Sequence, residues 1–290
     1  MSGATLTLRG FALTKGVSCV NGTLEVRRMA FSAGTQAMPW VAATNCTLRV
    51  LESQLNDSLA EGIVAEAGNS QIDGSRIERS ALQGLLLGSG SHSVLRSYIH
   101  SNRAIGIDGR FVTKLVVRRS SVFANRMGGI SGSSGQFDLT NNFVYRNGNA
   151  ANSQFGGVRI VNSNSGNRIE HNTIAYNDSD VNAAPPMAGG IYCTGLGGPN
   201  NLVYNNFAGN NMLPNAQVNS GCDMTGSLVR NGDGTNEPHF VSPIAEPFDF
   251  HLADPASPAA NVGRPSDLTE DFDGDARPNG LPDVGADELQ

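Results

Sequence analysis

The sequence predicts an all-β solenoid, in which coils of three short strands stack so that equivalent strands form parallel sheets. Three observations support this fold class: a repeat of 22 to 33 residues, three short apolar positions in each repeat, and polar corner residues that recur at the same spacing. The repeat is marked by glycines that precede an aliphatic residue, namely Gly62, Gly84, Gly106, Gly129, Gly157 and Gly190. The longer intervals place insertions at 147–155 and 177–188, on one side of the solenoid.

The strands of each coil follow from apolar positions that are too short to form a helix, since an amphipathic helix needs a longer run with a period of 3.6 residues. The second apolar position of successive repeats is Ile72, Val94, Val117, Leu139, Ile169 and Leu202. The third is Ile77, Ile99, Val122, Val144, Ile174 and Phe207. One coil cannot bury its own inward face, so we expect stacked coils with strands about 4.8 Å apart.

Polar residues occupy the corners between strands. One column is Ser58, Ser80, Asn102, Asn125, Asn147, Asn177 and Asn210, and a second column, five positions earlier, is Ser53, Ser75, Ser97, Ser120, Asn142, Asn172 and Asn205. Asparagine tolerates left-handed backbone angles at a sharp bend, and its side-chain amide can bond the equivalent residue one coil away. We therefore expect amide ladders with a structural role and not a catalytic one.

The charge distribution divides the chain into two parts. Residues 1–230 hold 18 Lys and Arg against 13 Asp and Glu, a net charge of +5, whereas residues 231–290 hold 2 against 13, a net charge of −11. We expect a solenoid over 1–230 and an acidic tail over 231–290. The body is too weakly basic for nucleic acid, and no run of 18 apolar residues predicts a membrane span.

These repeats resemble the right-handed parallel β-helix proteins of the pectate-lyase-like superfamily, over residues 5–230. The resemblance implies a right-handed parallel β-helix, with coils of about 22–33 residues, and an association with polysaccharides. Residues 238–288 resemble a nonrepetitive segment that follows exported bacterial β-helices, through Phe250-His251-Leu252, Ser257-Pro258-Ala259, 271–278 and 283–288. It implies a capping tail that covers the last coil, and a secreted or cell-surface bacterial protein whose export signal, or further coils, precede residue 1.

The four cysteines show no CxxC spacing, which disfavours a zinc site. They fall into two pairs, each within about one repeat, so Cys19–Cys46 and Cys193–Cys222 would suit disulfides in an exported protein. The alternative is four buried free thiols.

Two outward columns carry the candidate ligand-binding residues. One holds Arg96, Arg119 and His171 as a basic stripe, with His100 and Tyr145 beside it. The other is Val64, Leu86, Asp108, Ser131, Arg159 and Tyr192, with Arg110 two positions beyond Asp108. Asp108 has no acidic neighbour one coil away, which disfavours hydrolysis by a carboxylate pair. Long arginine stems that merely cover coil edges are the structural alternative.

The stretch "DFDGD" at 271–275 places three carboxylates in alternation, at Asp271, Asp273 and Asp275, as a Ca²⁺ loop would. It lacks the bidentate glutamate of an EF-hand. The alternative is a turn stabilised by an aspartate side chain, with Arg277 paired to Asp283 or Glu288. No other cofactor is indicated.

The leading functional hypothesis is a monomeric, exported protein that binds or scaffolds, with acidic polysaccharide as the ligand. One alternative is a polysaccharide lyase that works from the Arg96–Arg119–His171 face, with Lys114 as base if it points the same way. No catalytic motif of the pectate, alginate or chondroitin lyases matches this chain residue by residue. The other alternative is a purely structural stalk or adhesin segment.

Overall fold

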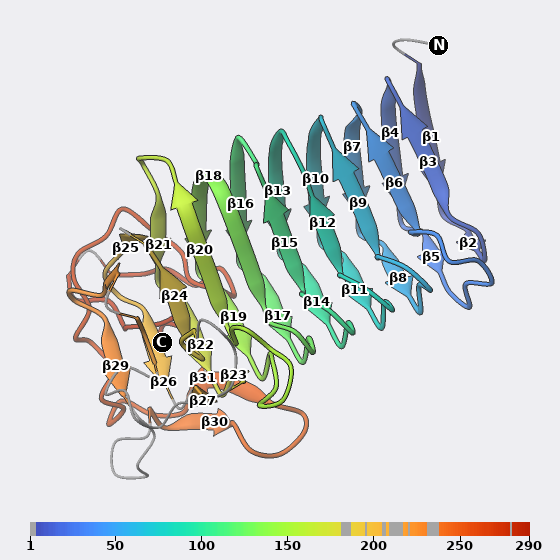
Figure 1. Cartoon of the computed structure of the whole chain (residues 1–290). Coiled ribbons are helices and arrows are strands. Elements are labelled where there is room, and N and C mark those ends of the chain that lie inside the picture. Colours follow the sequence, from blue (N-terminus) through green and yellow to red (C-terminus); the bar gives the residue numbers. More distant parts are fainter. Residues whose placement is uncertain are drawn as a thin grey trace.

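The computed structural model describes residues 4–290 apart from 181–186, 195, 205–206, 209–216, 220, 231–237 and 279. Every regular element among these residues is a β-strand, and the strands wind into a long solenoid (Figure 1). Within them, no helix has the length and apolar character needed to cross a membrane.

Three parallel sheets form the sides of the solenoid. Sheet A contains β1 (Thr5–Arg9), β4 (Thr23–Arg27), β7 (Thr47–Leu51), β10 (Asn69–Asp73), β13 (Ser91–Leu95), β16 (Lys114–Arg118), the second half of β18 (Ile130–Thr140) and β21 (Arg168–Glu170). Sheet B contains β2 (Ala12–Leu13), β5 (Ala30–Phe31), β8 (Gln54–Asn56), β11 (Arg76–Glu78), β14 (Tyr98–His100), β17 (Ser121–Phe123), β19 (Phe143–Tyr145), β22 (Thr173–Ala175), β26 (Leu202–Tyr204) and β29 (Leu228–Arg230).

Sheet C contains β3 (Val17–Val20), β6 (Val41–Thr44), β9 (Ile63–Glu66), β12 (Leu85–Leu87), β15 (Ile107–Arg110), the first half of β18, β20 (Val158–Ser163) and β24 (Ile191–Cys193). Two short parallel pairs join β23 (Asp178–Ser179) to β27 (Phe207–Ala208) and β25 (Leu196–Gly197) to β28 (Cys222–Asp223). Beyond the coils, β30 (Phe240–Ser242) pairs antiparallel with β31 (Asp249–Leu252).

The predicted three-strand coil is confirmed. Ile99 pairs in parallel with Ile77 on one side and with Val122 on the other, and all three side chains are fully buried. The same register continues to Ile174, so one apolar core runs through the stack. Each coil buries its inward side chains because the equivalent strands one coil away present the same apolar positions.

The amide ladders are also confirmed. Asn125 donates from Nδ2 to Asn147 Oδ1 at 2.9 Å, and Asn147 donates in the same way to Asn177 at 2.9 Å. At the other corner, Asn142 donates to Asn172 at 2.9 Å. These buried side chains satisfy one another from coil to coil, which supports the structural role assigned to them.

The left-handed backbone, however, lies one residue before each ladder residue. The φ angles are 45° at Arg96, 50° at Arg119, 54° at Asn141 and 52° at His171. The ladder side chain must point inward to reach its neighbour, so the bend is made by the residue that precedes it. The expectation that the ladder asparagines themselves adopt left-handed angles was therefore wrong.

The coil that contains β26 is shifted relative to the prediction. Asn172 donates to Asn201 Oδ1 at 2.9 Å, so Asn201 continues the ladder where Asn205 was expected. As a result Val203 faces the core, and Leu202 packs in a separate cluster on the outer face of sheet B. The predicted positions Asn205 and Asn210, and the side chain of Phe207, lie outside the described residues.

We expect Asn147→Ala to destabilise the protein by about 1–3 kcal/mol, because the buried N–H and the side-chain amide of Asn125 would both lose the acceptor Asn147 Oδ1. Chemical denaturation measures this loss. Arg126→Ala is the matched control, since Arg126 is an exposed corner residue. Arg146 cannot serve as control, because it donates to Pro243 O at 2.9 Å. Equal effects of Asn147→Ala and Arg126→Ala would refute the role of the ladder.

Both proposed disulfides are present. Cys19 bonds to Cys46 and Cys193 bonds to Cys222, each across neighbouring coils. The alternative of four free thiols is therefore wrong, since no cysteine is free.

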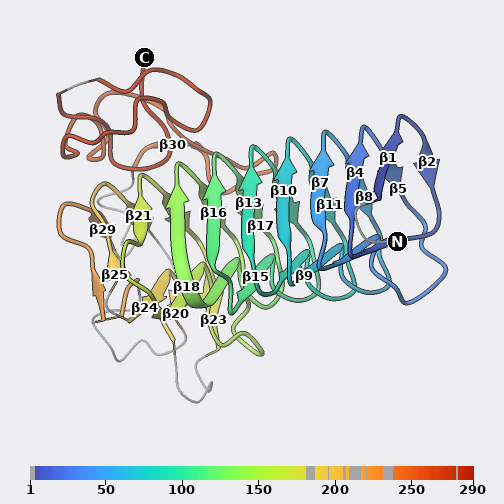
Figure 2. The same ribbon diagram turned by 90° about the horizontal axis from the view of Figure 1, so that it is seen from above.

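Residues 238–290, here called the tail, lie along the flank of the C-terminal coils (Figure 2). They form a second apolar core with the outer face of sheet B. Its sheet residues are Phe143, Tyr145, Ala175, Leu202 and Tyr204, and its tail residues are Phe240, Phe250, Leu252, Ala259, Val284 and Ala286.

The expected position of the tail needs correction. We expected it to cover the last coil, but its contacts extend over the side of the solenoid from Arg119 to Asn200. The physical reason is the aromatic surface of sheet B: Tyr145 packs against Phe250 with ring centroids 4.5 Å apart, and Phe143 packs against Phe272 at 4.6 Å. The predicted domain boundary at 231 falls in 231–237, outside the described residues.

Candidate functional site

The basic stripe predicted along one corner exists as a column. Arg96, Arg119 and His171 occupy equivalent left-handed positions between sheets A and B, followed by Asn200 with a φ of 62°. The corner therefore presents one left-handed residue per coil, with Gly74 at the position before Arg96.

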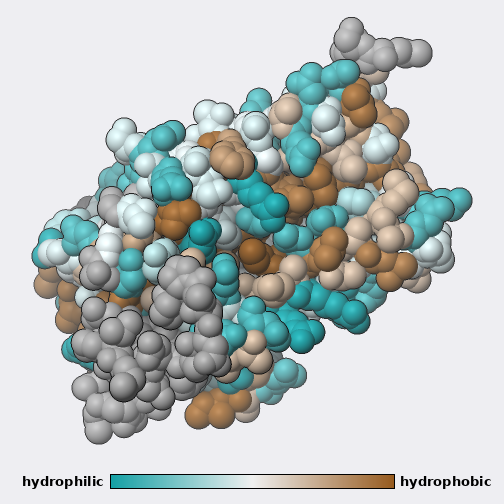
Figure 3. Space-filling view, in the orientation of Figure 1, coloured by the Kyte–Doolittle hydropathy of each residue, from teal (hydrophilic) through white to brown (hydrophobic). Residues whose placement is uncertain are grey.

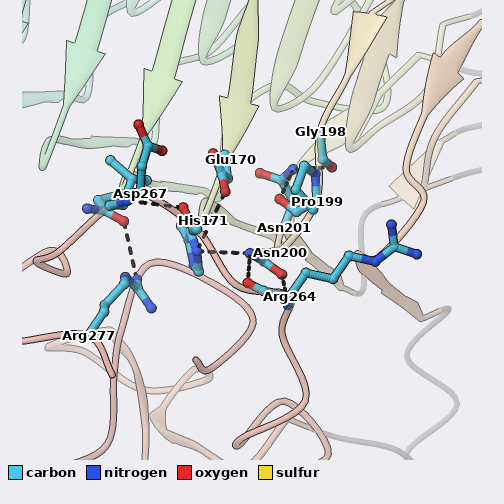
Figure 4. Close-up of polar contacts among 12 residues, drawn as sticks. Glu170, His171, Gly198, Pro199, Asn200, Asn201, Arg264, Asp267 and Arg277 are labelled. Atoms are coloured by element: carbon cyan, nitrogen blue, oxygen red, sulfur yellow. Dashed lines mark hydrogen bonds and ion pairs between the residues drawn. The ribbon is translucent and has the colours of Figure 1, made fainter. Parts of the chain in front are cut away.

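The tail prevents this column from acting as one open surface. Arg119 donates from Nε to Phe272 O at 2.9 Å and forms an ion pair with Glu270 at 3.0 Å. His171 is completely buried, and its Nε2 lies 3.0 Å from the Asn200 side-chain amide (Figure 4). The prediction of a continuous basic ligand site at Arg96, Arg119 and His171 is thus wrong, because the tail binds Arg119 and covers His171.

The surroundings of His171 favour its neutral form. Burial, together with the nearby guanidinium of Arg277, lowers the pKa of His171 from 6.5 to about 3. Burial likewise lowers the pKa of His100 to about 4. The unfolded chain therefore binds these protons more readily than the folded chain as the pH falls.

We expect His171 to lower the free energy of unfolding progressively as the pH falls from 6.5 towards about 3, and to have no such effect above pH 6.5. His171→Asn should flatten this dependence, because Asn cannot titrate and already occupies the equivalent left-handed position at Asn141. Melting temperatures across this pH range measure the effect. An unchanged pH dependence in His171→Asn would contradict the assignment.

Arg96 is the one member of the stripe whose side chain remains exposed. It pairs with Asp73 through two hydrogen bonds, at 3.0 and 2.5 Å. Both residues line a pocket of about 290 Å³ together with Arg27, Arg49 and Glu52. Arg27 pairs with Glu52 and Arg49 with Glu25, so the cations of this pocket are neutralised by neighbouring carboxylates.

His100 and Tyr145 lie on the outer face of sheet B, at two ends of an aromatic stack. His100 stacks on Phe123 at 4.4 Å, and Phe123 stacks on Tyr145 at 4.8 Å. His100 Nε2 is 2.7 Å from Glu78. Burial raises the pKa of Tyr145, whose ring is covered by the tail. Tyr145 is therefore a docking residue for the tail, and its predicted role in ligand binding is wrong.

The second predicted column lies in register on the outer face of sheet C. Asp108 pairs with Ser131, Ser131 with Arg159, and Arg159 with Tyr192 across successive strands. Arg110 donates twice to Asp108 Oδ2, at 2.8 and 2.6 Å. Figure 3 looks onto this face, where a hydrophobic area over β9 and β12 adjoins a hydrophilic area over β15. The structure thus brings Asp108 and Arg110 together in the same row as Arg159, with Ser131 between Asp108 and Arg159.

Arg159 is the residue of this column that sequence reasoning did not select. Its side chain is half-buried, and its Nε is buried without a hydrogen-bond partner. Within the described part of the chain it forms no ion pair, in contrast to Arg110 and Arg96. The repeat already placed Arg159 in the column, but the lack of a partner is visible only in three dimensions.

The predicted calcium loop does not form from its three aspartates. Asp271 is completely buried, and its carboxylate accepts the N–H groups of Gly274, Asp275 and Glu288 at 2.8, 2.8 and 3.1 Å. Among the described residues, Asp271 and Asp275 join no cluster of metal-binding side chains. The turn interpretation is confirmed, and Arg277 pairs with Glu288 at 2.8 Å.

These positions limit the chemistry that the surface supports. Lys114 begins β16, at the opposite end of that strand from the corner residue Arg119, so it does not join the basic stripe. Asp108 has Leu86 and Ser131 as its neighbours across the strands, so a carboxylate pair for hydrolysis is absent from this column. The outer face of sheet C is suited to binding, through a guanidinium, a paired Asp108–Arg110 and Tyr192.

Comparison with known proteins agrees with the fold. Residues 61–235 match the family model described as a right handed beta helix region. The chain is similar to the crystal structure of pectate lyase Pel9A, with a TM-score of 0.52 and 16% identity, over 100% of this chain and 87% of that one. At this identity the likeness concerns the fold. No curated protein matches the sequence.

Proposed function

The chain belongs to the right-handed β-helix family, and from this premise we propose that it binds an acidic polysaccharide along the outer face of sheet C. Arg159 carries the proposal. Its guanidinium is half-buried and forms no ion pair among the described residues, and its terminal N–H groups, unlike the buried Nε, can form charge-assisted hydrogen bonds with a ligand carboxylate.

The neighbours of Arg159 support this choice of face. Tyr192 and Ser131 flank it on the adjacent strands, which lie about 4.8 Å apart, so donors and acceptors recur along the solenoid axis. Asp108 and Arg110 extend the row by one more strand. An extended sugar chain that lies along this axis would meet one outward side chain per coil.

The experiment is a binding assay on a glycan array of acidic and neutral polysaccharides. We expect binding to acidic chains only, weakened by salt, and Arg159→Ala should weaken it about 10- to 100-fold, as expected for loss of a charge-assisted hydrogen bond. Arg103→Ala, which removes the same charge from an exposed corner position, is the control. An equal loss of affinity in both variants would show that the net charge of the protein, and not Arg159 itself, determines glycan binding.

The same assay separates the two alternatives. Ultraviolet absorbance from an unsaturated uronate product would identify a polysaccharide lyase. The surface from which the lyase was proposed to work is not open, since the tail covers Arg119 and His171. Absence of binding to every glycan would favour a structural stalk or adhesin segment.

We also propose that the chain works in an oxidising compartment, as a secreted or surface protein. The support is the pair of disulfides, each of which joins neighbouring coils. Mass spectrometry after alkylation of protein from the intact cell tests this, with four unmodified cysteines as the expected result and four alkylated ones as the contrary result.

A further inference from the structure

Three tail residues that lie far apart in the sequence bring metal-ligating atoms together. His251 lies on β31, Asp273 in the 271–275 turn, and Asp287 close to the end of the chain. Their ligand atoms all lie within 4.8 Å of one another. We propose that His251, Asp273 and Asp287 bind a divalent transition metal ion of the Zn²⁺ class, which fastens the tail.

The orientation of His251 fits a metal ligand. Its Nε2 lies 2.9 Å from Asp273 Oδ2, and its Nδ1 lies 2.5 Å from Asp249 Oδ1. A histidine that binds a metal through one nitrogen generally donates its other N–H to a carboxylate, which fixes the ring and its tautomer. Asp249 is placed for this positioning role, leaving Nε2 for the metal.

The environment of Asp287 is an independent indication of a metal site. The residue is only 8% exposed, and one of its oxygens accepts the Leu252 N–H at 2.7 Å. Its other oxygen has no donor among the described residues, and no lysine or arginine of that set forms an ion pair with it. This oxygen is not completely buried, so an ion can reach it, and a cation there would offset the cost of burying most of the carboxylate.

The donor set selects the type of ion. Ca²⁺ and Mg²⁺ prefer oxygen ligands throughout, whereas an imidazole with two carboxylates suits Zn²⁺, whose ligands lie roughly 2.0–2.2 Å away. With three protein ligands, water would complete the shell. The competing occupant is a proton on Nε2, with which His251 would simply bridge Asp249 and Asp273.

The ion would connect three separate segments of the tail. His251 also packs its ring edge-on against Phe143 of β19, with centroids 4.8 Å apart. Metal binding is therefore coupled to docking of the tail on sheet B. The site lies outside the outer face of sheet C, so its test is independent of the glycan assay.

The test is calorimetric titration of the metal-stripped full chain with ZnCl₂, CaCl₂ and MgCl₂, together with thermal unfolding. We expect one Zn²⁺ per chain, a raised melting temperature, and slower hydrogen exchange over residues 249–252 and 283–288. Asp273→Asn, a change at a half-exposed side chain that should leave folding intact, should abolish binding. Asp249→Asn should weaken binding roughly 10- to 100-fold, as expected for a positioning carboxylate.

Two matched controls should bind Zn²⁺ normally. Asp275→Asn changes a carboxylate in the same turn, and His239→Ala changes another tail histidine, which pairs with Asp254 at 3.2 Å. Lack of Zn²⁺ binding, preference for Ca²⁺ over Zn²⁺, or full binding in Asp273→Asn would each overturn the proposal and leave the protonated His251 as the explanation of the cluster.

Discussion

Ile99→Asp should prevent the solenoid from folding. Ile99 is completely buried in the continuous core, between Ile77 and Val122 of the adjacent coils. The substitution would place a carboxylate there without a cation or a hydrogen-bond donor, which costs several kcal/mol. It would also remove apolar contacts on both sides of the coil, and domains are stable by only about 5–15 kcal/mol. We expect loss of soluble protein, or loss of the cooperative transition followed by circular dichroism.

The neighbouring substitution Tyr98→Asp is the matched control. It introduces the same charge one residue away on the same strand, but the side chain of Tyr98 points outward and is 43% exposed. Tyr98 lies beneath the guanidinium of Arg76, at 5.4 Å, so only a modest loss is expected. A soluble Ile99→Asp variant with an unchanged melting temperature would show that the inward register is wrong.

Deletion of residues 238–290 should leave a β-helix that associates. The deletion would expose Phe143, Tyr145 and Tyr204 on the outer face of sheet B, where they are now no more than 8% exposed. Burying an aromatic or aliphatic side chain of this size contributes about 1.5–3 kcal/mol, so the bare surface strongly favours contact between copies. It would also remove the acidic part of the chain, and with it much of the net repulsion. Light scattering of the truncated chain measures the association.

A repaired truncation separates aromatic exposure from loss of charge. Phe143→Thr, Tyr145→Thr and Tyr204→Thr remove the exposed rings, and threonine suits the strand because Thr173 already pairs with Phe143. The repaired chain should be monodisperse at the same net charge. If the unrepaired truncation is itself monodisperse, the aromatic surface is not what the tail protects.

The course of the coils could be determined from the sequence because the repeat is local. A residue such as Val122 meets its equivalents Ile99 and Val144 at nearly constant sequence separation, so the pattern itself encodes the partners. The row on the outer face of sheet C, including Asp108 and Arg159, followed from the same reasoning. The register was lost in the coil of β26, where Asn201 replaces the expected Asn205 after a longer insertion.

The position of the tail was decided only by the tertiary structure. Its contacts join residues that no repeat relates: Arg119 meets Phe272 over a separation of 153 residues, and Arg277 meets Asn141 over 136. Such pairs depend on the shape and polarity of a surface that exists only once the coils have stacked. For that reason the sequence could place Arg119 and His171 on one corner but could not show that the tail covers them, nor that His251, Asp273 and Asp287 converge.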